Sequence, residues 1–127
     1  MNTEILNQYH VKFIILQTEI GQKALVETSA PQNMLSRYIA DYFIQSTPDG
    51  MRDGVLDNIS RAQSNQPFDP TLNDHEMASI IVGAQNCVLH DYDEAKEPES
   101  IPTNDLVEII ESWIEWIETN NLQAKIL

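Results

Sequence analysis

The sequence predicts an α+β domain in which an antiparallel sheet of two hairpins packs against helices, in the order β-β-α-α-β-β-α. Two observations support this prediction. Short β-branched and aromatic runs occur in two pairs, each with a glycine between its members, and segments with apolar residues at helical spacing follow each pair. A length of 127 residues suits one core, so we expect residues 1–127 to form a single domain.

The first predicted hairpin lies near the start of the chain. Residues 11–16 read Val-Lys-Phe-Ile-Ile-Leu, and residues 24–28 read Ala-Leu-Val-Glu-Thr. Side chains of these kinds favour the half-buried surface of a strand. Gly21 lies between the two runs, where a tight turn is needed.

The next segments have helical spacing. Pro31 suits the first turn of a helix, and apolar residues then recur three and four positions apart at Met34, Tyr38, Ile39, Tyr42 and Phe43. This helix is expected to end before the turn cluster at residues 47–50. A second, shorter helix is predicted from Met51, Val55, Leu56, Ile59 and Ala62. Gly54 weakens it by about 1 kcal/mol relative to alanine.

A second hairpin is predicted after a loop rich in proline and asparagine at residues 64–74. Its strands are residues 76–82 and 86–92, and residues 83–85 contain the glycine that closes the turn. Apolar runs of this length also occur in buried helices, so the strand assignment depends on the turn between them.

The final element is predicted to be an amphipathic helix. Residues 93–102 form a charged connection with two prolines, which disfavour helix just before them. The helix is expected to run to about Thr119, with Thr103 or Asn104 as its N-cap. Its apolar arc consists of Leu106, Ile109, Ile110, Trp113, Ile114, Trp116 and Ile117.

Negative charge is concentrated in the second half of the chain. Residues 66–127 contain 13 acidic residues and two lysines, whereas residues 1–65 contain seven acidic and five basic residues. Like charges at helical spacing destabilise a helix by roughly 0.2 to 0.5 kcal/mol per pair, so the clustering favours a role outside the chain. A net charge of −13 opposes direct binding to nucleic acid or to an anionic membrane. The expected partner is a basic protein.

One negative surface is therefore predicted as the partner-binding site. Its residues on the connection are Asp91, Asp93, Glu94, Glu97 and Glu99, and its residues on the helix are Asp105, Glu108, Glu111, Glu115 and Glu118. Trp116, at the edge of the apolar arc, is the candidate aromatic contact. Two simpler interpretations remain open: the charges form only a solvated face, and both tryptophans serve packing.

Signatures of catalysis, metal binding and cofactor binding are not found. The three histidines are not spaced as ligand pairs, and neither a P-loop nor a nucleophile motif occurs. An enzyme would have to use Asp69, Asp74, His75 and Glu76, brought together in a pocket. We therefore expect no catalysis, no metal and no cofactor. The lone Cys87 and the N-terminus without a signal-peptide pattern predict a cytoplasmic protein.

The C-terminal block resembles small bacterial immunity proteins of polymorphic toxin and contact-dependent growth inhibition systems. The resemblance rests on residues 91–94 (Asp-Tyr-Asp-Glu), an acidic gap containing proline, and residues 100–113 (Ser-Ile-Pro-Thr-Asn-Asp-Leu-Val-Glu-Ile-Ile-Glu-Ser-Trp). It covers about 25 residues well and the order of elements loosely. The loop at residues 64–75 is longer and richer in proline than in that family.

This resemblance implies a cytoplasmic antitoxin that binds a toxin domain, often a nuclease, and blocks its active site or substrate path. The charge pattern leads separately to a basic partner. The leading hypothesis is therefore an immunity protein that neutralises the basic C-terminal toxin domain of a secreted effector. The alternative is an acidic regulatory or nucleic-acid-mimicking domain that binds another basic protein.

Overall fold

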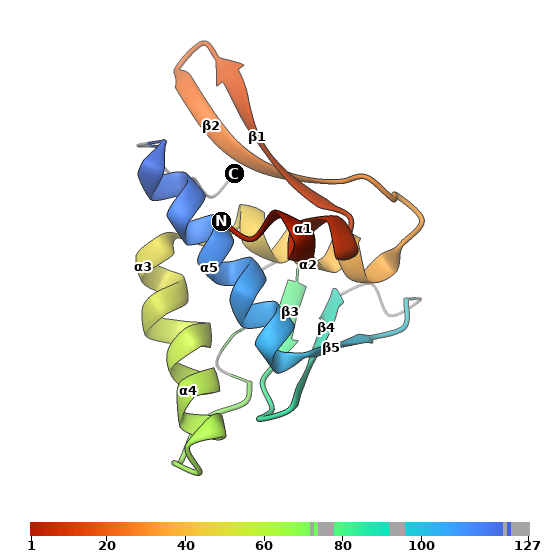
Figure 1. Cartoon of the computed structure of the whole chain (residues 1–127), viewed down its shortest axis with the longest axis vertical. Helices are drawn as coiled ribbons and strands as arrows, with labels where there is room; N and C mark the ends of the chain where they lie inside the picture. Colours follow the sequence, from red (N-terminus) through yellow and green to blue (C-terminus); the bar gives the residue numbers. More distant parts are fainter. Residues whose placement is uncertain (72, 74–77, 92–95, 121, 123–127) are drawn as a thin grey trace.

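A computed structural model describes residues 1–71, 73, 78–91, 96–120 and 122, and it confirms the α+β class. The elements are α1 (Thr3–Gln8), β1 (Val11–Thr18), β2 (Gly21–Thr28), α2 (Met34–Ile44), α3 (Pro48–Met51), a π-helical segment η1 (Arg52–Leu56), α4 (Asp57–Gln63), β3 (Ala78–Ile81), β4 (Asn86–Asp91), β5 (Glu99–Pro102) and α5 (Thr103–Thr119). Figure 1 shows α1 and α2 between a projecting β1–β2 hairpin and a second sheet, with α3, α4 and α5 along one side of the molecule.

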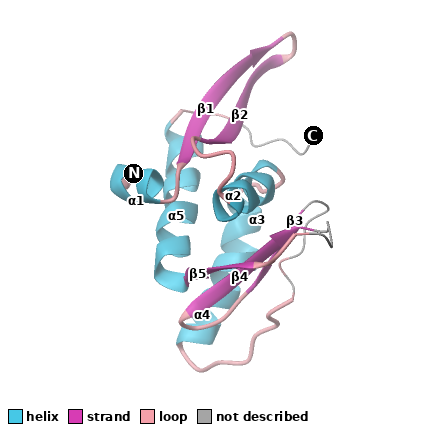
Figure 2. Cartoon of the chain, turned by 90° about the vertical axis from the view of Figure 1, so that its right-hand side faces the viewer, coloured by secondary structure: helices cyan, strands magenta, loops and turns pink. Residues whose placement is uncertain are grey.

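The two predicted hairpins lie in separate antiparallel sheets. β1 and β2 form one sheet, in which Phe13 is opposite Val26. The other sheet has the order β3-β4-β5. Gly21 has a φ of 120°, which glycine adopts readily because it has no Cβ, and this explains its position directly after the hairpin turn. Figure 2 shows the two sheets at opposite ends of the molecule.

Strand β5 lies within the segment that the sequence predicted to be an irregular connection. Ile101 pairs with Cys87 of β4, and its side chain is fully buried. Such a strand gives little signal because it is only four residues long and ends in Pro102. Proline is compatible with the end of an edge strand, where its missing N–H is not required.

Helix α1 was not predicted from the sequence. It has six residues, and only Ile5 and Leu6 are buried. A single turn and a half is too short to show a helical period. Asn2 caps the helix by accepting a hydrogen bond from the backbone N–H of Ile5, at 3.2 Å.

Both middle helices are present, with details that differ from the prediction. α2 begins at Met34, where Asn33 accepts a hydrogen bond from the N–H of Ser36, and Pro31 lies before the helix. The second helix is the continuous run α3-η1-α4, whose centre is π-helical and contains Gly54. A π-helical turn widens the spacing of side chains. In this protein the π-helical segment begins at Arg52, whose guanidinium contacts Glu118 on α5.

Helix α5 ends at Thr119 as predicted, but its N-cap is Pro102 rather than Thr103 or Asn104. Thr103 is fully buried, and its hydroxyl donates to the carbonyl of Gly83 at 2.7 Å. A tertiary hydrogen bond therefore uses the side chain that could have capped the helix. Except for Trp116, which is half-buried, every residue of the predicted apolar arc is buried.

Trp113 lies at the centre of the core. Its ring is 5.1 Å from Phe13 of β1, 6.0 Å from Phe43 of α2 and 5.7 Å from Trp116. The indole is fully buried, and its Nε1 has no hydrogen-bond partner within the described residues. The indole therefore stabilises the fold through apolar packing that joins α5 to α2 and to the projecting hairpin.

We predict that Trp113→Ala destabilises the protein by about 3 to 5 kcal/mol, because it leaves a large cavity between these elements. The loss should be measured as a shift in the midpoint of urea unfolding followed by circular dichroism. Trp116→Ala is the control, since its half-exposed ring should cost less. A loss for Trp113→Ala below about 1 kcal/mol would contradict the central packing role.

Candidate functional site

The acidic face of α5 follows directly from the helical period. Glu108, Glu111, Glu115 and Glu118 are exposed on the side of α5 opposite its buried residues, and we call them the acidic helix face. Burial of Ile109, Ile110 and Trp113 on the opposite side sets the rotation of the helix. The four carboxylates therefore point away from the core without any further constraint.

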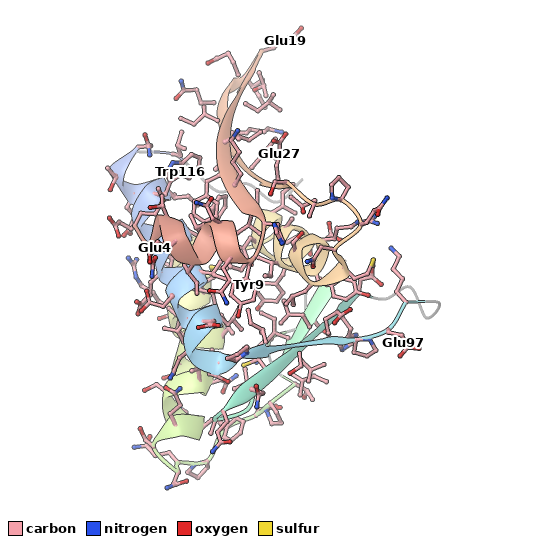
Figure 3. The ribbon with its side chains drawn as sticks, turned by 45° about the vertical axis from the view of Figure 1, so that its right-hand side comes forward. Glu4, Tyr9, Glu19, Glu27, Glu97 and Trp116 are labelled. Atoms are coloured by element: carbon pink, nitrogen blue, oxygen red, sulfur yellow. The ribbon has the colours of Figure 1, made fainter. Side chains whose placement is uncertain are left out.

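The N-terminal segment covers one side of this face. Asn2 Nδ2 donates to Glu108 at 3.3 Å, and the N-terminal ammonium of Met1 pairs with Glu115 at 2.9 Å. The Tyr9 hydroxyl donates to Asp105. Figure 3 shows Glu4 on α1 and Tyr9 at its end, where the helix runs beside α5. These contacts could not be predicted from local sequence patterns, because about 100 residues separate the partners.

Tyr9 is the titratable group most clearly affected by these contacts. The pKa of Tyr9 is raised from 10.0 to about 12, mainly by burial. The hydrogen bond to Asp105 and the negative charge of Asp105 also raise it. The protonated phenol is therefore favoured in the folded protein. Asp105 is thus an intrachain acceptor in this structure rather than an open contact for a partner.

Arg52 covers the other side of the acidic helix face. Its guanidinium binds both carboxylate oxygens of Glu118, at 2.9 and 2.5 Å, and lies 3.3 Å from Asp49. The hydrogen bonds from Arg52 lower the pKa of Glu118, and the pKa of Arg52 is raised in return. Both side chains are about half-exposed, so the pair adds little to the stability of the fold.

An open groove of about 470 Å³ runs between η1 and α5, and we call it the acidic groove. It is lined by Arg52, Leu56, Glu111, Ile114, Glu115, Glu118 and Thr119. Glu111 is exposed and makes no hydrogen bond or ion pair with any described residue. Three carboxylates and one guanidinium around an apolar floor leave this groove with a net negative charge.

The acidic residues of the connection that the structure describes are not part of the acidic helix face. Glu97 lies on the opposite side of the molecule from Glu4, the residue beside α5 (Figure 3). Glu97 is exposed and Glu99 is half-buried in β5, whereas Asp93 and Glu94 lie outside the described residues. The expectation of one continuous negative surface is therefore corrected, because β5 leads the chain across the molecule between the connection and α5.

Asp91 faces a neighbouring helix rather than solvent. Its side chain is only 10% exposed and pairs with Lys96 at 3.3 Å. Burial raises the pKa of Asp41 on α2, and the negative charge of Asp91 raises it further. The positive charges of Arg37 and Lys96 oppose this rise. Asp91 therefore belongs to a mixed-charge cluster between β4 and α2.

Trp116 is positioned by packing. Its ring is 5.6 Å from Phe13, and it stacks on Trp113 with an interplanar angle of 18°. Its exposed part lines a second groove of about 400 Å³ together with Met1, Leu6 and Val11. A partner could reach only this edge of the indole.

Of the four residues considered for catalysis, the structure describes only Asp69. Asp69 accepts hydrogen bonds from the N–H and hydroxyl of Thr71, which lower its pKa, whereas Asp74, His75 and Glu76 lie outside the described residues. No group of three or more possible metal ligands occurs in the described ranges. Cys87 is buried and contacts the hydroxyl of Thr103 at 3.3 Å.

One polar pair was missed by the sequence analysis. Ser79 Oγ is 2.7 Å from His90 Nε2, because the two residues are opposite each other on β3 and β4. Their positions on either side of the predicted hairpin turn could have indicated the pairing. Ser79 is only 1% exposed, so a substrate cannot reach its hydroxyl, and the contact serves to join the two strands.

Comparisons with known proteins give no match to a family model, to a curated protein or to a solved structure. Among the helices that the structure describes, none has the length and apolar character needed to cross a membrane.

We predict that Tyr9→Phe lowers stability by about 1.5 kcal/mol, because it removes a hydrogen bond to a charged acceptor. The folded pKa of Tyr9 is raised to about 12. This contribution is therefore complete below about pH 10 and is lost as the pH rises toward the folded pKa. Urea unfolding of both proteins at about pH 8 and pH 11 measures the difference. An equal loss in both proteins between these pH values would exclude this role.

Proposed function

We propose that this chain is an immunity protein that neutralises a basic toxin domain by taking a cationic segment of it into the acidic groove. The observation that supports the proposal most directly is Glu111, which has no partner within the described residues and lies in an open groove with two further carboxylates. The immunity assignment comes from the resemblance of the C-terminal block, and the groove supplies a physical means of binding.

Arg52 supports the fit of a basic side chain. Its guanidinium binds Glu118 through two parallel hydrogen bonds, and this geometry is the one by which arginine recognises a carboxylate. An arginine or lysine of a partner can reach Glu111 and Glu115 from the solvent side of the groove, because both carboxylates are exposed. Ile114 and Leu56 offer apolar contact to the aliphatic part of such a side chain.

The net charge of the chain supports fast capture of a basic partner. A charge of −13 steers a cationic protein toward the chain over a distance of about one Debye length, roughly 8 to 10 Å at physiological salt. A nuclease holds its substrate through lysine and arginine side chains that neutralise phosphates. Carboxylates that pair with those side chains compete with the substrate, and this competition is the proposed mechanism of neutralisation.

The decisive experiment uses the product of a gene adjacent to this one that is toxic on expression. Co-expression of the wild-type chain should restore growth, and the purified proteins should bind each other more weakly as salt rises from about 0.05 to 0.5 M. A basic partner that is not toxic would favour the alternative of a regulatory or nucleic-acid-mimicking domain. A partner whose binding does not respond to salt would argue against the acidic groove.

Glu111→Lys should abolish protection, because it places a positive charge in the groove that binds the basic segment. The fold should stay intact, because Glu111 is exposed and has no partner in the described structure. Glu19→Lys is the matched control, since it changes the net charge equally at the exposed turn between β1 and β2. Growth rescue and the association rate are the two readouts, with circular dichroism as the check on folding. Equal protection by both variants would remove the groove from the proposal.

Arg52→Gln should increase the association rate for the basic partner, because Arg52 is the only cation among the described residues that line the acidic groove. Stability should change little, as expected for an exposed pair. The pKa of Glu118 should rise toward its ordinary value, which NMR titration of the side chain can follow. Slower association would show that Arg52 itself contacts the partner.

A further inference from the structure

Strand β1 has an outer edge that makes no backbone hydrogen bond to any other described residue. The backbone N–H of Ser29 donates to the carbonyl of His10 at 2.8 Å, so these two residues form a hydrogen-bonded pair. Such pairs alternate along an antiparallel ladder, so every second residue from His10 onward along β1 bonds to β2. The backbone groups of Phe13, Ile15 and Gln17 therefore point away from β2. None of them bonds to another part of the described chain.

The distal half of this hairpin projects from the body of the protein (Figures 1 and 2). It exposes apolar side chains. Ile15 is 44% exposed and Leu16 is 45% exposed. Leu16 shares the outer face of the hairpin with Ile14 and Leu25, which are half-buried. A two-stranded sheet of this kind is marginally stable unless further strands or helices cover it.

The other sheet of the same protein has protected edges. On β3, Ile80 donates to the carbonyl of Asn73 and Val82, just beyond the strand, donates to that of Pro70. β5 is four residues long and ends in Pro102. By contrast, β1 has eight residues with neither proline nor glycine, and its one charged side chain is Lys12. Apart from Lys12 near its start, β1 has none of the devices that normally prevent edge-to-edge pairing among the described residues.

We infer that the outer edge of β1 is a self-association surface that pairs antiparallel with β1 of a second copy of this chain. Charge favours this occupant. The hairpin carries two lysines, Lys12 and Lys23, and two glutamates, Glu19 and Glu27, so the whole net charge of −13 lies outside it. The hairpin is therefore a surface on which two strongly acidic chains can meet without direct repulsion.

A two-fold axis at Ile15 gives a self-complementary register. The outward N–H and C=O groups of Ile15 meet those of the second Ile15, and Phe13 lies opposite Gln17. Ile14 lies opposite Leu16, and Lys12 lies opposite Thr18, so no like charges face each other. The product is a four-stranded sheet with a continuous apolar stripe on its outer face.

Two edge variants and one control test this surface on the full chain. Leu16→Glu places a carboxylate in the pairing interface, while Lys23 directly opposite in the hairpin keeps the monomer paired. Ile15→Pro removes the N–H at the two-fold axis, and that N–H has no partner among the described residues of the monomer. Ile20→Glu makes the same change of charge at the turn, where Ile20 is 75% exposed but lies off the edge.

Sedimentation equilibrium should give the wild-type chain twice its monomer mass of 14.5 kDa at high protein concentration. The dimer should strengthen as salt rises, because screening reduces repulsion between the acidic bodies, and this dependence is opposite to that of the acidic groove. Ile20→Glu should still dimerise, whereas Leu16→Glu and Ile15→Pro should stay monomeric with unchanged circular dichroism.

Three outcomes would overturn the inference. A wild-type chain that remains monomeric at every concentration and salt has no such surface. Dimers that persist in both edge variants use another part of the molecule. A monomeric wild type that loses binding to its basic partner on Leu16→Glu uses the edge of β1 for that partner instead of a second copy.

Discussion

The apolar face of α5 is buried at the centre of the molecule, and other elements pack around it. This helix packs against α1, α3, β4 and β5, and its Trp113 contacts the rings of Phe13 and Phe43. The two sheets share no strand pairing, so α5 and α2 provide the core that connects them. Burial of an indole and several isoleucines supplies apolar stabilisation of the size needed to hold such a small domain together.

The same burial fixes where the charges point. Once the apolar side of α5 faces inward, the helical period directs four glutamates toward solvent, and repulsion between them is the cost. The structure reduces this cost with cations from distant parts of the chain, Arg52 and the N-terminal ammonium, which pair with Glu118 and Glu115. Glu111 keeps no such partner in the described structure, and this residual charge is what makes the acidic groove a candidate binding site.

Several elements escaped the sequence analysis for identifiable reasons. α1 and β5 are too short to complete a hydrophobic period, and β5 exists only because Ile101 pairs with Cys87 of β4. Thr103 is a good N-cap by its chemistry, yet a buried hydrogen bond to Gly83 takes its hydroxyl. Each difference arises where a contact between distant residues outweighs a local preference.

The α+β class, the two hairpins and the amphipathic division of α5 can be predicted from local patterns, because each depends on periodicity or turn chemistry within a few residues. Which charges remain available depends instead on contacts between distant residues. Packing of α1 and η1 against α5 brings Tyr9 to Asp105 and Arg52 to Glu118, and the path through β5 places Glu97 away from the acidic helix face. A sequence gives the number of charges on each element, but the relative positions of the elements depend on side-chain packing between residues far apart in the chain.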